Sequence, residues 1–144
     1  MKNKYGFILI KPQLGENIGA SARSLKNFGF KNLIITNSAG SLKKENPPGT
    51  IMIIDGHINC TFQDNLNDPK IIRDRKFHSS ELFTIAKQVA FENDIPIASG
   101  NYCWTLGPAY ETSSEIQYLT SLSGSSVGMS TLPEIQEGGN LGLN

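Results

Sequence analysis

Two short segments of this 144-residue chain combine residue types that could bind a small ligand. Residues 107–112 (GPAYET) place an aromatic ring, Tyr110, next to a carboxylate, Glu111. Such a ring can stack on a flat ligand while the carboxylate accepts hydrogen bonds from its N–H groups. Residues 127–131 (VGMST) offer the Ser130 hydroxyl and adjacent backbone N–H groups at an expected helix start. That arrangement suits an anion.

A third turn of small and polar residues, 37–40 (NSAG), follows a short apolar run. Apolar spacing predicts strands over 5–10, 32–36, 50–54, 95–103 and 126–129, and helices over 16–28, 79–93, 111–122 and from Pro133. Residues 60–78 are expected to form a solvated loop. Strands that alternate with helices predict an α/β fold with a mostly parallel sheet flanked by helices. Ligands bind beyond the carboxyl ends of such strands, so the three turns predict one small-ligand site.

The composition is that of a soluble globular chain forming a single α/β domain, residues 1–144. Hydrophobic residues make up 38% and charged residues 18%. Thirteen basic residues balance thirteen acidic ones, so no net charge favours nucleic acid or a membrane surface. Cys60 and Cys103 lack metal-ligand spacing, and we expect two reduced thiols, no metal site and a cytoplasmic location.

The segment 12–29 (PQLGENIGASARSLKNFG) contains a second candidate site on an expected helix. Asn17, Gly19, Arg23, Phe28 and Gly29 fit, without a gap, motif 1 of the SpoU (SPOUT-type) RNA 2′-O-methyltransferases, which this segment resembles over residues 5–37. The resemblance implies a catalytic arginine, Arg23, and S-adenosylmethionine as cofactor. From physics alone the same residues also fit a surface helix with one exposed arginine.

The rest of the chain resembles the trimeric-type purine nucleoside phosphorylases. Four strings carry the resemblance in family order: TNSAGSL (36–42), DGHIN (55–59), GPAYET (107–112) and VGMSTLPE (127–134). The likeness covers about residues 22–144 and overlaps the methyltransferase-like segment as far as Asn37. We therefore expect one domain of mixed ancestry, with a methyltransferase-like segment 1–37 and a phosphorylase-like segment 37–144.

The resemblance implies phosphorolysis, in which phosphate attacks the ribose anomeric carbon while the purine leaves. Glu111 would hydrogen-bond the purine and favour its departure, and Tyr110 would flank the base. Tyr102 would line the base pocket, and Met129 would pack on the ribose. No cofactor is implied beyond inorganic phosphate as co-substrate, and the implied assembly is a homotrimer.

For the phosphate, the resemblance implies the Ser130 hydroxyl and the backbone N–H of Ser38, with Asn37 orienting that turn. The family also uses an Arg-x-His loop upstream of this turn and a base-recognising Asn downstream. Neither is found in this sequence, whose only histidines are His57 and His78. Gly56 occupies the Asp position of the family's Asp-His-Ile-Asn.

These departures predict a homologue truncated at both ends, with weak or undetectable phosphorolysis, because burying phosphate charge without an arginine partner is costly. His57 is expected to be structural and His78 to be exposed. Two alternatives remain open. The chain could be a fragment of an RNA 2′-O-methyltransferase, although a Gly-x-Glu motif 2 is missing, or a non-catalytic remnant that binds a nucleoside or phosphate.

Overall fold

The described residues form two sheets, and helices connect the parallel strands within each sheet. The computed structural model describes residues 7–10, 15–63 and 69–144, with side chains from residue 21 onward. Strands β1 (Phe7–Ile10) and β2 (Leu33–Thr36) pair in parallel, and helix α1 (Gly15–Asn27) connects them. This unit agrees with the expected elements at 5–10, 16–28 and 32–36, although residues 5 and 6 lie outside the described part.

The second sheet has five strands in the order β3-β7-β6-β4-β5. Their bounds are β3 Gly40–Ser41, β4 Ile51–Asn59, β5 Ile71–Ile72, β6 Ile97–Trp104 and β7 Gly124–Gly128. The three central strands are parallel, and the two short edge strands pair antiparallel to them. The prediction of an α/β fold with a mostly parallel sheet is confirmed. The edge strands β3 and β5 were not expected, because two-residue strands carry no periodic signal.

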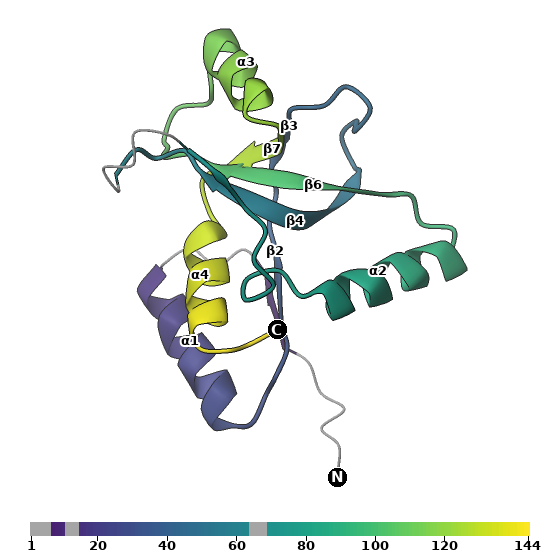
Figure 1. Cartoon of the computed structure of the whole chain (residues 1–144), viewed down its shortest axis with the longest axis vertical. Coiled ribbons are helices and arrows are strands. Elements are labelled where there is room, and N and C mark those ends of the chain that lie inside the picture. The colour runs from purple at the N-terminus through teal and green to yellow at the C-terminus, as the bar shows by residue number, and fades with distance from the viewer. Residues whose placement is uncertain (1–6, 11–14, 64–68) are drawn as a thin grey trace.

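Helices α2 (Ser80–Glu92), α3 (Ser113–Ser121) and α4 (Leu132–Asn140) follow strands of this sheet. The Ser79 hydroxyl caps α2 by accepting the Leu82 N–H at 3.3 Å, at the start of the helix expected over 79–93. Figure 1 shows α3 at one end of the sheet, α2 projecting to the side, and α1 lying next to α4. Within the described ranges, no helix is long and apolar enough to cross a membrane.

The hydrophobic core lies between the central strands and α3. Its buried members are Ile58, Cys60, Cys103, Leu119 and Val127. Both cysteines are free, and the neighbouring Cys60 together with burial raises the pKa of the Cys103 thiol.

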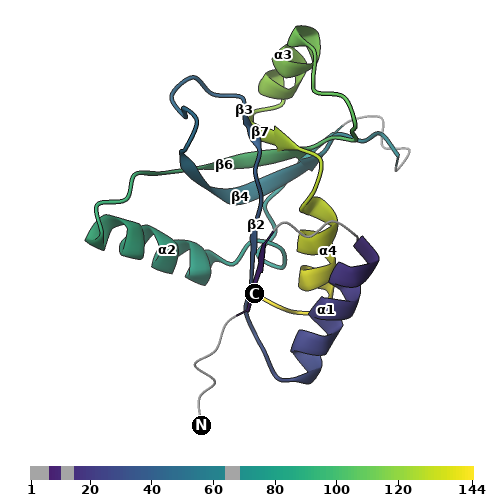
Figure 2. The same ribbon diagram turned by 180° about the vertical axis from the view of Figure 1, so that it is seen from behind.

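The residues after α4, which follows the large sheet, form hydrogen bonds with the first βαβ unit. The Leu33 N–H donates to the Asn144 carbonyl at 2.8 Å, and the Asn144 N–H donates to the Lys31 carbonyl at 2.7 Å. The Lys26 ammonium also donates to the Leu141 carbonyl. The view from behind shows the same arrangement, with the chain end beside β2 and α1 against α4 (Figure 2). The first βαβ unit therefore packs on the last helix.

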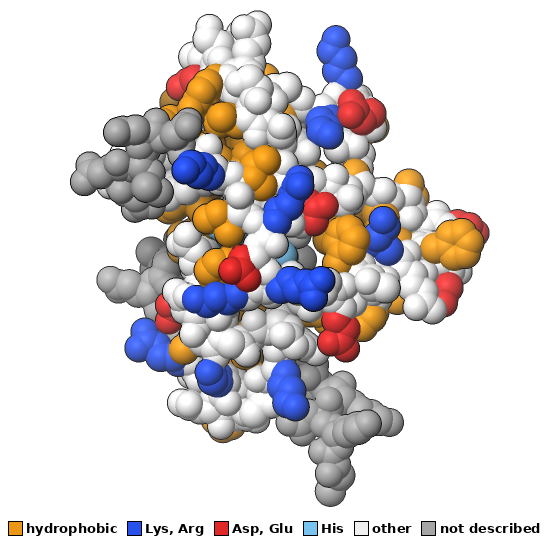
Figure 3. Space-filling view, in the orientation of Figure 1, with side chains coloured by type: hydrophobic (Ala, Val, Ile, Leu, Met, Phe, Trp, Pro, Cys, Tyr) orange, Lys and Arg blue, Asp and Glu red, His pale blue; other side chains and the backbone are white. Residues whose placement is uncertain are grey.

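The expectation that His78 is exposed is wrong. His57, at the end of β4, is fully buried, and its Nδ1 lies 2.8 Å from Nε2 of a half-buried His78. The Phe77 ring meets His57 edge-on, with centroids 5.7 Å apart. The charged residues of the segment 60–78 favoured the prediction of a solvated loop. In the structure the end of this segment, at Phe77 and His78, packs against His57 of β4. Figure 3 shows histidine atoms in a hollow of this face.

Burial and, to a smaller extent, the neighbouring His78 together lower the pKa of His57 to about 4. Burial also lowers the pKa of His78, against the opposing effects of the Ile54 backbone and Asp55. Both rings are therefore held in their neutral forms. The imidazole pair joins the end of β4 to the segment that leads into α2.

Acid is expected to destabilise the protein through His57. Above about pH 6.5 the ring is neutral in both the folded and the unfolded state, so it adds no pH dependence. Between about 6.5 and 4 only the unfolded state takes up the proton. The free energy of unfolding then falls by up to about 1.4 kcal/mol per pH unit. Urea denaturation at pH 7.5 and pH 5 measures this loss.

The matched control is His57→Asn, which keeps an N–H donor near the position of Nδ1 but does not titrate. The variant should lose less stability than the parent chain over the same pH interval. Glu134 and the exposed carboxylates are common to both proteins and cancel in the comparison. Equal losses in the two proteins would show that His57 does not carry the acid sensitivity.

Candidate functional site

The turn that follows β2 reaches the end of β7 through a side-chain hydrogen bond. The Asn37 amide Nδ2 donates to Oγ1 of Thr131. Strand β3 begins three residues after Asn37 and pairs antiparallel with β7, with Gly40 opposite Val127. That pairing brings the predicted phosphate turn, including the exposed Ser38, to the carboxyl end of the neighbouring strand. Two of the three predicted turns are thus joined.

Thr131 is held in an unusual backbone conformation. Its φ of 82° lies in the left-handed region, which a β-branched residue rarely adopts, and the residue is 2% exposed. Its carbonyl accepts the Ile135 N–H at 3.0 Å in the first turn of α4. Strained residues of this kind cluster at functional sites. Thr131 stands in the VGMSTLPE string, but its part in joining the turns was missed.

The Tyr102 hydroxyl contacts the backbone of the turn at Ser130. The ring is fully buried, and its hydroxyl donates to the Ser130 carbonyl at 2.6 Å and lies 3.4 Å from the Ser130 nitrogen. Burial raises the pKa of Tyr102. A Cβ at Gly128 would lie 2.6 Å from the hydroxyl oxygen, so this position needs glycine. In this structure Tyr102 holds the backbone that presents the Ser130 side chain.

The third turn is connected to the same strand. The Thr105 N–H donates to the Gly128 carbonyl at 3.0 Å, and the Thr105 hydroxyl donates to Oε1 of Glu111 at 2.7 Å. Gly107 lies against the side chain of Met129, whose sulfur would be 2.6 Å from a Cβ at that glycine. The three predicted turns therefore form one connected edge. Thr105 was missed, although it stands two residues before the GPAYET string.

The side chains at this edge differ in exposure. Tyr110 is 91% exposed and Met129 is 37% exposed, so both are accessible. Glu134, in the first turn of α4, is buried, and its Oε2 has no hydrogen-bond partner among the described residues. Burial raises its pKa. A protonated Glu134 would oppose an anion at the start of α4 less than a charged one.

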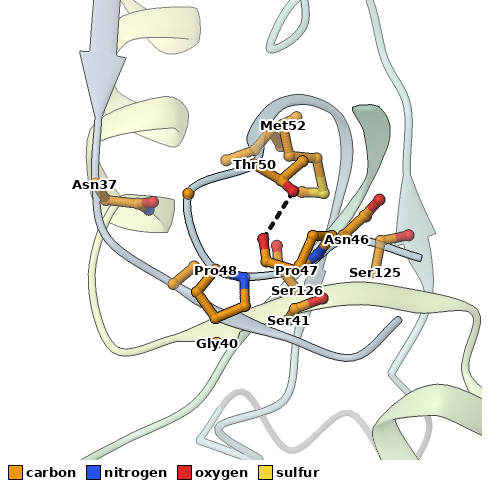
Figure 4. A pocket seen from close by; sticks show the side chains of 13 residues that line it. Asn37, Gly40, Ser41, Asn46, Pro47, Pro48, Thr50, Met52, Ser125 and Ser126 are labelled. Carbon is orange, nitrogen blue, oxygen red and sulfur yellow. Dashed lines mark hydrogen bonds between the residues drawn. The ribbon is translucent and has the colours of Figure 1, made fainter. Parts of the chain in front are cut away.

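A cavity of about 320 Å³ lies next to this edge but does not coincide with it. Figure 4 shows the loop of Pro47 and Pro48 around it, with Thr50 donating to the Pro47 carbonyl at 2.7 Å. Asn37 is the only predicted site residue among its lining residues. Apart from Asn37, the predicted site residues of the three turns therefore lie outside this cavity.

The second candidate site, on α1, contains Asn17 and Arg23. The Arg23 side chain is exposed, and its Nε lies 4.0 Å from a carboxylate oxygen of Glu137 on α4. The side chain of Asn17 is outside the described part. Among the described residues, no three His, Cys, Asp or Glu side chains are grouped as metal ligands.

The sequence profile of the phosphorylase superfamily matches residues 14–143. The chain belongs to the purine nucleoside phosphorylase family. The match begins at residue 14, whereas the phosphorylase resemblance read from the sequence begins at about residue 22. It therefore includes Asn17 and Arg23, so phosphorylase similarity reaches into the methyltransferase-like segment.

Among its relatives, purine nucleoside phosphorylase 1 of Bacillus subtilis is 32% identical over 135 aligned positions, and the match covers 89% of this chain and 50% of the relative. The enzyme of the same name from Geobacillus stearothermophilus is 36% identical over 120 aligned positions, and that match covers 78% of this chain and 44% of the relative. This chain thus spans about half the length of these phosphorylases.

The fold agrees with solved structures of the family. Purine nucleoside phosphorylase from Schistosoma mansoni in complex with inosine superposes with a TM-score of 0.77 at 28% identity, covering 91% of this chain and 50% of that chain. The S. mansoni isoform 2 in complex with cytosine and ribose-1-phosphate gives the same TM-score at 29% identity, with coverage of 91% and 50%.

Tyr102→Phe is expected to destabilise this phosphorylase-family chain by about 1 kcal/mol, because it removes the hydroxyl donor to the part-buried Ser130 carbonyl. Urea denaturation at neutral pH measures the change. Tyr118→Phe is the control, since that ring is 41% exposed on α3, and it should change stability by less than about 0.5 kcal/mol. Equal effects of the two substitutions would contradict a supporting role for Tyr102.

Proposed function

We propose that this chain binds a purine ribonucleoside and inorganic phosphate at the edge formed by its three turns, and that it catalyses slow phosphorolysis to the free base and ribose 1-phosphate. The observation that carries the proposal is the series of contacts that connects Asn37, Ser130 and Glu111 through three intervening residues. Those residues are Thr131, Gly128 and Thr105.

The base-binding half of the proposal is supported by Glu111 and Tyr110. The carboxylate is fixed by a hydroxyl donor, and its remaining lone pairs can accept an N–H of a purine. The adjacent exposed ring of Tyr110 can cover a face of the base. Met129 packs beside Gly107 and leaves part of its side chain open to a ribose.

The phosphate-binding half is supported by Ser130 and the turn at Ser38. The Ser130 hydroxyl stands at the beginning of α4, where the helix dipole and free N–H groups favour an anion. Asn37 holds the Ser38 turn against this helix start through Thr131. A phosphate oxygen bound there would attack the anomeric carbon of the ribose, while the C–N bond to the purine breaks.

The rate of this reaction would depend on positioning and electrostatics. Glu111 would stabilise the departing base through its N–H, and the Ser130 and Ser38 groups would align the phosphate. The phosphate would carry its charge into the site without the arginine that the family's upstream loop supplies. This loss weakens both binding and the stabilisation of the transition state.

We expect inosine to be converted to hypoxanthine in the presence of phosphate with a kcat well below the roughly 1 s⁻¹ at the low end of ordinary enzymes. Glu111→Gln should abolish the activity, because the amide carries no charge. A coupled absorbance assay of hypoxanthine release measures both proteins, and the variant purified in parallel also reveals any contaminating phosphorylase. Equal rates in the two proteins would contradict the role of Glu111, and an ordinary kcat in the parent chain would contradict the expected weakness.

We further propose that the chain forms a homo-oligomer, a trimer by its resemblance to the family. The proposal is supported by large apolar side chains that remain exposed on α2: Ile85 and Val89 are each 48% exposed, and Phe91 is 85% exposed. Figure 3 shows hydrophobic side chains on this projecting helix. Ile85 and Val89 stand one helical turn apart on the same face, and exposed apolar groups of this kind commonly mark protein interfaces.

Light scattering coupled to size-exclusion chromatography should give three times the 15.7 kDa mass of the chain. Val89→Glu, which places a charge on the exposed apolar face of α2, should shift the mass toward that of the monomer. The control is Gln88→Glu, since Gln88 is already polar and exposed. A parent chain that elutes as a monomer at all concentrations would contradict the proposed assembly.

A further inference from the structure

The Thr105 hydroxyl fixes the orientation of Glu111. Its oxygen lies 2.7 Å from Oε1 of the carboxylate, and a hydroxyl donating to a carboxylate makes a strong, charge-assisted hydrogen bond. We propose that Thr105 is a positioning residue that aims Glu111 at the N–H edge of the bound purine. This inference rests on the proposed function and extends it to a residue outside the quoted motifs.

Thr105 is itself held in place. It follows directly on β6, and its N–H donates to the Gly128 carbonyl at the end of β7 at 3.0 Å. Its β-branched side chain has few χ1 rotamers, so a fixed backbone also restricts the hydroxyl. A donor with this little freedom can hold a longer and more flexible side chain.

Glu111 is anchored from the other side. The next residue, Thr112, is the N-cap of α3, and its side chain and N–H form a capping box with Glu115. In that box the Thr112 N–H donates to Oε2 of Glu115 at 2.7 Å, and the Glu115 N–H donates to the Thr112 hydroxyl at 3.3 Å. The backbone at Glu111 is therefore set by α3, and its carboxylate is set by Thr105.

The balance of donors and acceptors defines the ligand that this pair would bind. A threonine hydroxyl has one proton, which is given to Oε1 of Glu111. The pair then presents only acceptors to a ligand, namely Oε2 of Glu111 and the lone pairs of Thr105 Oγ1. A heterocycle with ring N–H donors fits this pair, whereas one with an N-methyl group at the same position offers the pair no proton and gains nothing from the orientation of Glu111.

Preorganisation is the advantage of this contact. A glutamate that is free in solution must lose side-chain rotamer entropy when it binds a ligand. Here that cost has already been met during folding. Removing the Thr105 hydroxyl should weaken ligands that use Glu111 and leave other ligands unaffected.

The test is isothermal titration calorimetry of the full chain with hypoxanthine and with 1-methylhypoxanthine, which lacks the ring N1–H. Thr105→Val keeps the shape of the side chain and removes its hydroxyl, and we expect hypoxanthine to bind about tenfold more weakly, equivalent to about 1.4 kcal/mol. Thr105→Ser restores the hydroxyl and should bind within about threefold of the parent chain. Binding of 1-methylhypoxanthine should be the same in all three proteins.

Two controls separate positioning from a general loss of structure. Thr120→Val removes a threonine hydroxyl that only donates to the Ile116 carbonyl on α3, and it should leave hypoxanthine binding unchanged. In a Glu111→Gln background, Thr105→Val should have much less effect than in the parent chain, because the charged acceptor is gone. A merely structural role of Thr105 would weaken both ligands and would not depend on Glu111.

The outcomes distinguish the two proposals. If hypoxanthine binds the parent chain and Thr105→Val binds it equally well, the role of Thr105 is overturned while the proposed function stands. If Thr105→Val weakens both ligands alike, or if Thr105→Ser fails to restore binding, the positioning role is overturned as well. If neither hypoxanthine nor inosine binds the parent chain, the proposed function is overturned, and the role of Thr105 in purine binding with it.

Discussion

The antiparallel pairing of β3 with β7 is the constraint on which the candidate site depends. Strand β2 belongs to a different sheet from β7, so its carboxyl end has no neighbour in the large sheet. The two residues of β3 turn the chain back along β7 and leave Asn37 within hydrogen-bonding distance of Thr131. Once that contact is made, the turn after β2, the start of α4 and the end of β6 share one edge.

The polar groups of this edge are connected mostly through the backbone of one short segment. Residues 128–131 form hydrogen bonds with Thr105, Tyr102 and Asn37, and these three residues come from one strand and two loops. A buried tyrosine is well suited to this task because its hydroxyl can both donate and accept. Tyr102 is fully buried and contacts the backbone of Ser130, whereas the exposed ring at this edge belongs to Tyr110.

The mixed ancestry suggested by the motifs remains a hypothesis, but the segment itself is physically part of the fold. Helix α1 packs against α4, and the Leu33 N–H of β2 donates a hydrogen bond to the Asn144 carbonyl. The phosphorylase profile covers α1 as well. An amphipathic helix followed by a glycine turn and a β-branched strand satisfies both families, since the same local physics builds a βαβ unit in each. The letters of this segment alone therefore do not distinguish a catalytic arginine from a surface one.

The sequence by itself determined the order of the main helices and strands, the α/β class and the three turns, because periodicity, caps and glycines act over a few residues. The helices expected over 79–93 and from Pro133 correspond to α2 and α4 for that reason. Only the tertiary structure decided that the strands divide into two sheets and that His78 packs on the buried His57. It also decided that Thr105 and Thr131 connect the turns. These features depend on which distant segments meet, and a contact between residues 94 positions apart leaves no periodic trace in the chain.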